Sequence, residues 1–164
     1  MVIKPYEPIS DWDVITLRYL LDMVGKEDIQ ALEVGCGKST EVLLERCDLT
    51  IIECNSERAA EFDGRAKIFI MDSGEYRSED KFDFIFIDGD HTYTHIGRDL
   101  DIFCPRLAHR GIICGHDYEG GGYYDRYINQ DCVFGKHHGV IKAVDEKFGN
   151  KVMKAPKGTV WWVK

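Results

Sequence analysis

Long hydrophobic runs are missing from this sequence. Its longest apolar stretches, such as residues 84–87, are far below the ~20 residues that a bilayer-spanning helix needs. The acidic N-terminus also lacks the basic and then apolar order of a signal peptide. These two absences predict a cytoplasmic protein with no membrane partner.

Positive charge is also in short supply. The 164 residues include 21 Lys and Arg against 29 Asp and Glu, which gives a formal net charge of −8. Such a balance repels polyphosphate, so nucleic acid is not expected as a broad-surface partner. The composition leaves a homo-oligomer open.

The cysteines lack the spacing of a disulfide framework or a zinc site. There are six, none of them in a C-x-x-C pair, and several lie inside apolar runs. The pattern favours buried free thiols that act as small hydrophobic side chains. Cys36 stands apart, because it lies between two glycines.

No repeat, linker or compositional break divides the chain, so a single domain over residues 1–164 is expected. From about residue 10 onward, short apolar runs alternate with segments of helical periodicity. This alternation predicts an α/β fold with a Rossmann-like, doubly wound and mostly parallel sheet. Two last segments, 151–154 and 158–163, flank a turn at Pro156 to Gly158 and predict a C-terminal antiparallel hairpin.

The boundaries of the predicted elements follow from the same periodicity. A leading helix is expected after Ser10, with Asp13 in a capping box and Gly25 at its end. Runs that are apolar on consecutive residues suit strands covered on both faces. The predicted strands are 30–35, 48–54, 66–71, 82–87 and 110–115, and the further helices are 39–46, 56–62, 93–104 and 138–148.

The stretch from Asp117 to His137 has little periodicity and is longer than a connection with no function usually is in a compact domain. It contains three consecutive glycines and five aromatic residues, among them Tyr118, Tyr123 and Tyr124. This composition predicts either a lid or acceptor-binding loop or a loop whose tyrosines pack locally.

A glycine-containing loop follows the strand predicted at 30–35, and a helix begins directly after it. Glycines let the backbone turn sharply and approach a ligand, and the helix N-terminus offers unpaired N–H groups. A dinucleotide fingerprint would need a third glycine at the position of Thr40. A carboxylate two residues before the first glycine is instead typical of sites for S-adenosylmethionine, which is cationic and has no phosphate. The predicted cofactor residues of this loop are Glu33, Gly35, Cys36, Gly37 and Ser39.

Acidic residues also end the next two predicted strands. Glu53 can accept hydrogen bonds from both ribose hydroxyls, and Asp72 with Ser73 is placed to meet the adenine. Together with Glu33, these acids lie at the carboxyl ends of successive strands, which is the edge where open α/β sheets bind ligands. The pattern favours a cofactor site over solvated surface acids.

The chain resembles class I S-adenosylmethionine-dependent methyltransferases. The likeness is carried by the loop from Glu33 to Gly37 and by three blocks at 82–93, 111–118 and 139–145. It implies a methionine-end site at Glu33, Gly35 and Gly37, a ribose acid at Glu53 and an adenine contact at Asp72. The closer likeness is to a branch of small-molecule O-methyltransferases, some of them metal-dependent. The long N-terminal cap that often binds the acceptor has no counterpart here, so the resemblance does not name the acceptor.

A second polar group follows the strands predicted at 82–87 and 110–115. Asp88, Asp90 and His91 follow the first of them, and His116 with Asp117 ends the second. Because adjacent strands lie ~4.8 Å apart, these side chains should converge on one ion or one substrate hydroxyl. Carboxylates suit Mg²⁺, and the histidine opens the site to Mn²⁺, Fe²⁺ or Zn²⁺.

Related metal-dependent O-methyltransferases resemble this arrangement, which implies an ion that lowers the pKa of a substrate hydroxyl. Asp88 and His116 are therefore candidate catalytic residues, and Asp88 is also assigned to the cofactor site. His116 is alternatively a general base that works without metal, since the ordinary histidine pKa is ~6.5. The structural interpretation of Asp88 is a cap for the helix near Thr92, for which Asp90 is the better candidate.

The remaining histidines have simpler interpretations. His95 and His109 are expected at the surface. His137 and His138 are expected to start a helix rather than to bind a metal, because adjacent residues diverge on a helix.

Methyl transfer from S-adenosylmethionine to a small-molecule acceptor, at a hydroxyl oxygen, is the function that the sequence favours. A non-catalytic S-adenosylmethionine-binding module stays open, since fold and cofactor do not guarantee turnover. An NAD-dependent oxidoreductase would share Glu53 but is disfavoured by Thr40 and Glu33.

Overall fold

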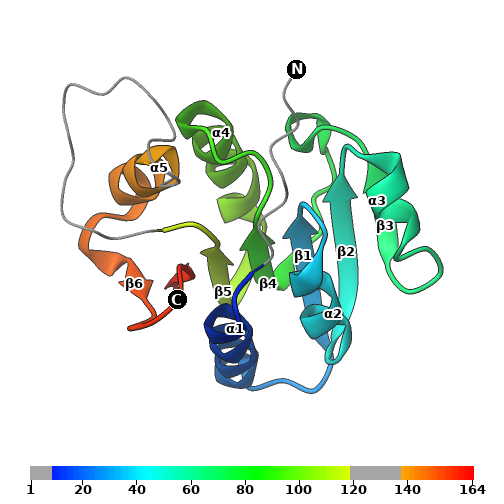
Figure 1. Ribbon diagram of the computed structural model, residues 1–164, viewed down its shortest axis with the longest axis horizontal. Helices are drawn as coiled ribbons and strands as arrows, with labels where there is room; N and C mark the ends of the chain where they lie inside the picture. Colours follow the sequence, from blue (N-terminus) through cyan, green and yellow to red (C-terminus); the bar gives the residue numbers. More distant parts are fainter. Residues whose placement is uncertain (1–8, 119–137) are drawn as a thin grey trace.

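The computed structural model describes residues 9–118 and 138–164 and is built around one seven-stranded sheet (Figure 1). The strand order is β3-β2-β1-β4-β5-β7-β6. Neighbours among the first five are parallel, whereas β7 is antiparallel to both β5 and β6. The predicted fold, a mostly parallel α/β sheet with a C-terminal antiparallel hairpin, is confirmed.

The observed elements follow the predicted periodicity closely. The strands are β1 Ile29–Val34, β2 Cys47–Glu53, β3 Lys67–Ile70, β4 Phe82–Ile87, β5 Leu107–Gly115, β6 Met153–Lys154 and β7 Trp161–Val163. The helices are α1 Asp11–Val24, α2 Lys38–Leu44, α3 Ser56–Ala60, α4 Tyr93–Phe103 and α5 His138–Phe148, with short 3₁₀ turns at Ser73–Glu75, Cys104–Arg106 and Gly149–Lys151.

Helix α1 begins and ends at the capping residues that the sequence predicts. Ser10 caps α1 and exchanges hydrogen bonds with Asp13 in a capping box. Gly25 ends the helix at φ 71°, a left-handed conformation that glycine adopts without strain.

Strand β5 differs from its prediction by starting three residues earlier, at Leu107 rather than at residue 110. Its pairing with β4 changes register between Phe82 and Phe84, and Arg110 has φ 64°. Such an irregularity interrupts the period-two pattern, so only the apolar half of the strand was visible in the sequence.

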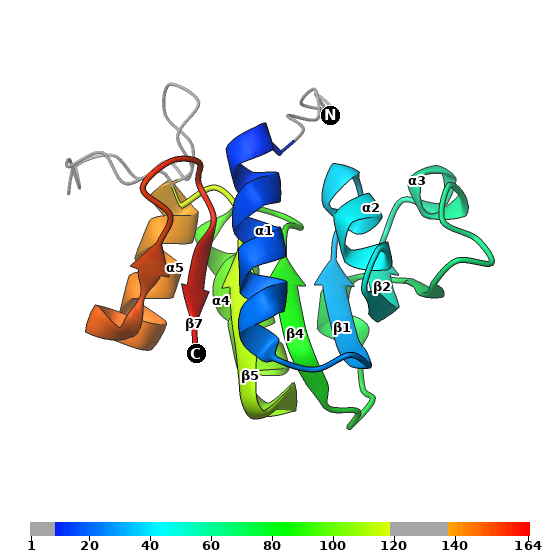
Figure 2. The same cartoon turned by 90° about the horizontal axis from the view of Figure 1, so that it is seen from below.

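Helices cover both faces of the sheet, as Figure 2 shows. On one face, Leu17 and Leu20 of α1 and Leu43 of α2 pack into one buried cluster. On the other face, α4 and α5 contribute to a second cluster through residues such as Leu100 and Val144. The strands are therefore buried on both sides, which is why they are apolar on consecutive residues.

The direction of chain progression reverses between β1 and β4, which are neighbours in the sheet. Connections leave this point in opposite directions, so a crevice opens at the carboxyl ends of the two strands. The loop after β1 and the turn after β4 meet there, and Gly35 and Asp88 line the same cavity.

Some sequence predictions concern residues outside the described ranges or depart from the structure. Tyr123, Tyr124, His137 and Cys132 lie outside the described residues. The other five cysteines are free thiols, of which Cys36 and Cys114 are buried while Cys54 is exposed, contrary to the expected burial. Within residues 9–118 and 138–164, no helix has the length and apolarity to cross a membrane.

Candidate active site

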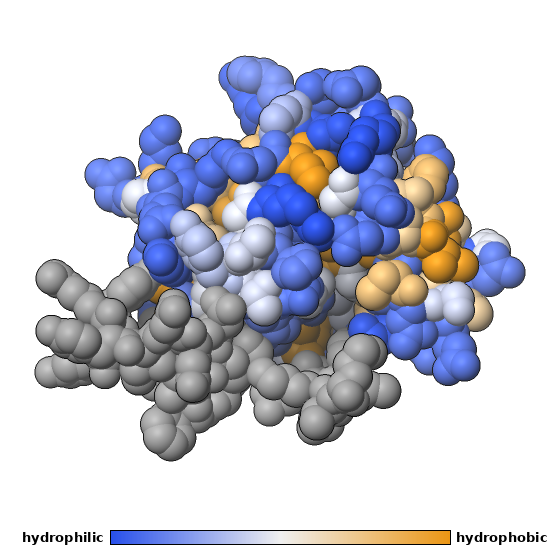
Figure 3. Space-filling view, turned by 90° about the horizontal axis from the view of Figure 1, so that it is seen from above, coloured by the Kyte–Doolittle hydropathy of each residue, from blue (hydrophilic) through white to orange (hydrophobic). Residues whose placement is uncertain are grey.

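A cavity of about 700 Å³ lies at the carboxyl ends of β1, β2 and β4. This volume is within the roughly 300–1,000 Å³ typical of small-molecule sites. Figure 3 looks onto this edge of the molecule, where hydrophilic residues cover most of the described surface. The predicted residues that line the cavity are Gly35, Glu53, Asp72, Ser73 and Asp88.

Glu53, at the end of β2, is 4% exposed and held by backbone donors. Its carboxylate accepts hydrogen bonds from the amides of Cys36 at 3.1 Å and Asn55 at 2.8 Å. The Arg58 guanidinium lies 3.5 Å away. Glu53 therefore fastens the glycine loop to the end of β2 and still borders the cavity.

Asp72 and Ser73 line the far side of the cavity and are tied to helix α4. Asp72 accepts a hydrogen bond from the amide of Gly74 at 2.8 Å and pairs with Arg98 at 2.9 Å. Ser73 donates to the buried Asp99 at 2.6 Å and accepts from Arg98 at 2.9 Å. Arg98 also lines the cavity, and the sequence carried no signal for it because its partners are about 25 residues away.

Gly35 occupies a position that only glycine can fill. Its φ is 82°, and an added Cβ would lie 2.4 Å from the carbonyl oxygen of Asp88. Its amide donates to Ile52 at 2.9 Å, which continues the β1–β2 pairing into the loop. The close approach of β1 and β4 at the cavity therefore depends on this glycine.

Glu33 is completely buried and does not line the cavity. Its carboxylate accepts hydrogen bonds from the hydroxyls of Ser39 and Thr40, the latter at 2.7 Å. Burial, with a smaller effect from nearby Asp88 and Glu53, raises the pKa of Glu33 to about 8 against the lowering effect of the hydroxyls. In this structure, Glu33 is therefore a buried acceptor for the two hydroxyls that follow the glycine loop.

Cys36, Gly37 and Ser39 are likewise not among the cavity-lining residues. The amide of Gly37 donates to Thr40 Oγ1 at 2.8 Å, and the amide of Cys36 donates to Glu53. A dinucleotide pyrophosphate needs free N–H groups at such a loop. Both amides already have acceptors, which argues against the dinucleotide alternative.

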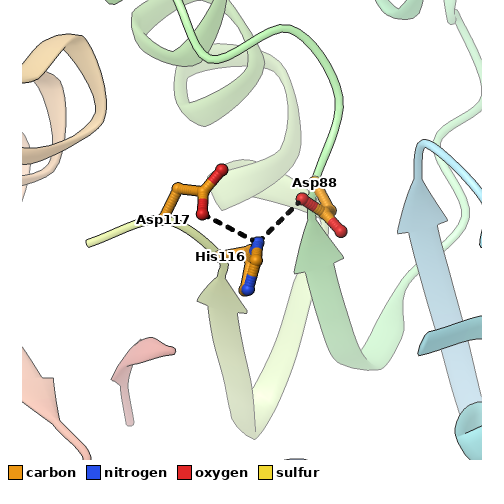
Figure 4. A group of neighbouring side chains, drawn as sticks. All are labelled: Asp88, His116 and Asp117. Atoms are coloured by element: carbon orange, nitrogen blue, oxygen red, sulfur yellow. Dashed lines mark ion pairs between the residues drawn. The ribbon is translucent and has the colours of Figure 1, made fainter. Parts of the chain in front are cut away.

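The second predicted group converges as expected. Donor atoms of Asp88, His116 and Asp117 all lie within 4.8 Å of one another. Figure 4 shows the three side chains at the ends of β4 and β5, with the imidazole between the carboxylates. His116 Nδ1 is 3.1 Å from Asp117 and 3.5 Å from Asp88.

His91, which follows β4 in the predicted group, is also a member of this site. Its Nδ1 lies 2.8 Å from Asp117, and its Nε2 lies 3.2 Å from Asp88. Its position shortly after β4 was the available signal, but nothing local shows that it bridges the ends of two strands.

The two carboxylates and two imidazoles shift one another's pKa values. Burial alone would raise the pKa values of Asp88 and Asp117, but hydrogen bonds and charge from His116 and His91 lower them. Burial alone would lower the pKa values of both histidines, but the carboxylates raise them. Both predicted roles of His116, metal ligand and general base, therefore require loss of a proton that the neighbouring carboxylates stabilise.

His95 is partly exposed, as expected for a residue at the surface, and it also lines the cavity. Its Nδ1 is 2.7 Å from the hydroxyl of Thr92, the N-cap of α4. Asp90 accepts a hydrogen bond from the Thr92 amide at 2.8 Å and so stabilises the turn before the helix. His109 is exposed and His138 starts α5, as expected.

The comparisons with solved structures show a shared fold at low sequence identity. A proposed caffeoyl-CoA O-methyltransferase from Staphylococcus aureus is 16% identical over 96% of this chain and 85% of that chain, with a TM-score of 0.69. CalS11, a TDP-rhamnose 3'-O-methyltransferase of calicheamicin biosynthesis, is 10% identical over 93% of this chain and 78% of its own, with a TM-score of 0.67.

A third structure is the N-methyltransferase NodS from Bradyrhizobium japonicum in complex with S-adenosylhomocysteine. It is 16% identical over 93% of this chain and 86% of its own, with a TM-score of 0.61. A search of curated protein sequences finds no significant match. The profile of the methyltransferase domain family matches residues 32–118, more than half of the sequence. The chain therefore belongs to the methyltransferase domain family and has the fold of class I S-adenosylmethionine-dependent methyltransferases.

Proposed function

We propose that this protein transfers the methyl group of S-adenosylmethionine to a hydroxyl oxygen of a small-molecule acceptor, with the help of Mg²⁺ or Mn²⁺. The position of Asp88 carries this proposal. Asp88 lines the cavity and also belongs to the cluster with His116 and Asp117. A ligand in the cavity and an ion at the cluster would therefore be neighbours.

The cavity fits the cationic cofactor, which supplies an activated methyl group when bound. Glu53 and Asp72 end successive strands and line the cavity, so each can accept hydrogen bonds from ligand hydroxyl or amino groups. Asp88 and Asp90 add negative charge at the other side, where a positive sulfonium would be favoured. Direct displacement needs alignment of nucleophile and methyl carbon more than it needs further chemistry from the protein.

The cluster fits a divalent ion by the chemistry of its donors. Two carboxylates and one imidazole within 4.8 Å of one another suit a single small cation. A bound ion would supply a Lewis acid that lowers the pKa of an acceptor hydroxyl. Asp88, His116 and Asp117 would hold it at the ends of two adjacent strands, where the backbone limits their movement.

CalS11, a TDP-rhamnose O-methyltransferase, supports a small-molecule acceptor. NodS is an N-methyltransferase. Both oxygen and nitrogen acceptors therefore occur among proteins with this fold. The cluster next to the cavity favours oxygen, since a Lewis acid activates a hydroxyl.

The test combines binding and turnover. Calorimetric titrations should show binding of S-adenosylmethionine and none of NAD; the reverse result would overturn the proposal. Methylation of a panel of hydroxylated compounds and amines should then be measured before and after exhaustive chelation, with metal content assayed in parallel. Full activity in metal-free protein would remove the ion from the proposal. Cofactor binding with no product across the panel would favour a non-catalytic binding module.

A further inference from the structure

Asp13 of α1 lies behind the cluster, on the side opposite the two cluster carboxylates. It is 1% exposed, and its Oδ2 lies 3.4 Å from Nε2 of His116. The other ring nitrogen, Nδ1, faces Asp117 and Asp88. The imidazole is thus held between Asp13 and the cluster, with one nitrogen toward each.

The Asp13 carboxylate is itself fixed in place. Oδ1 accepts hydrogen bonds from the amides of Thr159 at 2.7 Å and Val160 at 3.2 Å. Oδ2 accepts from the amide of Ser10 at 3.0 Å and from its hydroxyl. A Cβ at Gly158 would lie 2.3 Å from Oδ1, so the turn before β7 closes tightly over this group.

The same turn supports the cluster from a second direction. Thr159 accepts hydrogen bonds from the amides of Asp117, through its hydroxyl at 3.2 Å, and Tyr118, through its carbonyl at 2.9 Å. Helix α1, the turn before β7 and the end of β5 therefore form one hydrogen-bonded support around His116.

We propose that Asp13 is a positioning residue for the metal site: it accepts the Nε2 hydrogen of His116 and so directs Nδ1 to the ion. A neutral imidazole has one N–H and one lone pair, so the nitrogen that donates decides which nitrogen can bind metal. A carboxylate behind a ligating histidine fixes its tautomer and orientation and strengthens it as a ligand. With a nitrogen ligand fixed in this way, the site should bind Mn²⁺ or Zn²⁺ more tightly than Mg²⁺. The inference rests on the metal part of the proposed function.

Asp13→Asn in the full-length protein is the direct test. Asparagine keeps an oxygen for Thr159 and Val160 but replaces Oδ2 with an amide NH₂, which donates to Nε2 and drives the hydrogen to Nδ1. Calorimetric Mn²⁺ affinity should fall about ten- to a hundredfold, the range seen when such supporting groups are lost. S-adenosylmethionine affinity should stay within experimental error.

Ser10→Ala is the matched control. It removes the hydroxyl that donates to Asp13 Oδ2 and weakens the α1 cap, but it leaves the Ser10 amide and the contact with His116 in place. Its melting temperature should fall while its Mn²⁺ affinity is unchanged. Equal losses of Mn²⁺ affinity in both variants would overturn the proposal, because Asp13 would then act only through folding.

A measurement on the wild-type protein covers the case in which Asp13→Asn does not fold. Long-range ¹H–¹⁵N correlation of the histidine rings in the Zn²⁺-loaded protein should show His116 with hydrogen on Nε2 and metal on Nδ1. Metal on Nε2 would overturn the role of Asp13 and leave the metal site intact. Wild-type protein that binds none of Mn²⁺, Zn²⁺ and Mg²⁺ would overturn both this inference and the metal part of the proposed function.

Discussion

The two ends of the candidate site, the cavity at β2 and β3 and the cluster at β4 and β5, hold their acidic residues with different partners. At the β2 and β3 end, Glu53 and Asp72 accept hydrogen bonds from backbone amides and face arginines. At the β4 and β5 end, Asp88 and Asp117 face the ionisable rings of His91 and His116. Backbone donors cannot be exchanged, but a proton on an imidazole can be replaced by a cation. The first end is therefore complete within the fold, and the second is where the proposed ion would bind.

Asp117→Asn is expected to show the largest difference between the effects of one substitution on Mn²⁺ affinity and on S-adenosylmethionine affinity. Losing a charged ligand should weaken Mn²⁺ binding by more than the roughly hundredfold upper range for supporting residues. S-adenosylmethionine affinity should change less than about threefold, which is under 0.7 kcal/mol. Titration calorimetry of both ligands measures the split. Asp90→Asn is the control, since Asp90 lies near the cluster but outside it; an equal loss there would mean that bulk charge, and not ligation, is responsible.

Glu53→Gln should have the opposite effect and lower S-adenosylmethionine affinity more than Mn²⁺ affinity. Weakening an acceptor for ribose hydroxyls should cost about ten- to a hundredfold in S-adenosylmethionine affinity, or roughly 1.5–3 kcal/mol, with Mn²⁺ binding retained. Glutamine is preferable to alanine, because its one carbonyl oxygen can still accept from the amide of Cys36 or of Asn55, whereas alanine would leave both donors without Glu53. The exposed Glu57→Gln serves as a control on α3. Unchanged cofactor affinity in folded Glu53→Gln protein would remove Glu53 from the site.

The buried Glu33 should make stability depend on pH. Its pKa is raised from 4.5 to about 8, so the folded state binds a proton that the unfolded state has lost over this interval. The contribution of Glu33 to the free energy of unfolding is therefore fully present below pH 4.5. It falls as pH rises toward 8, by up to about 1.4 kcal/mol per pH unit.

Denaturant unfolding of wild type and Glu33→Gln between pH 5 and pH 8.5 isolates that effect. The difference in unfolding free energy between the two proteins should change in favour of the variant as pH rises. A constant difference across this range would show that Glu33 is already ionised in the folded protein.

Arg98→Gln should have the smallest effect. Arg98 ties Asp72 and Ser73 to α4, but its side chain is 35% exposed, so the ion pair is screened by solvent. We expect about a two- to fivefold loss of S-adenosylmethionine affinity, equivalent to ~0.4–1 kcal/mol. Arg65→Gln removes a surface pair with Glu41 and serves as the control. A loss as large as that of Glu53→Gln would place Arg98 in direct contact with the cofactor.

Much of this arrangement was predictable because it depends on strand ends. The carboxyl ends of parallel strands meet at one edge, so acids that end successive apolar runs were expected to gather there. Glu53, Asp72 and Asp88 do line one cavity, and His116 and Asp117 do approach Asp88. Glu33 has the same position in the pattern, yet its side chain points into the protein, where two hydroxyls of the following helix hold it.

The sequence by itself determined the order of the elements, the family resemblance and the edge of the sheet that carries the site, because periodicity and strand-end chemistry are local properties. Only the tertiary structure decided which side chains face one another across elements. His91 bridges two strand ends, Arg98 reaches back to the turn after β3, and Asp13 contacts a histidine 103 residues away. Such contacts depend on how helices and turns pack around the sheet, and no local pattern of residues encodes that packing.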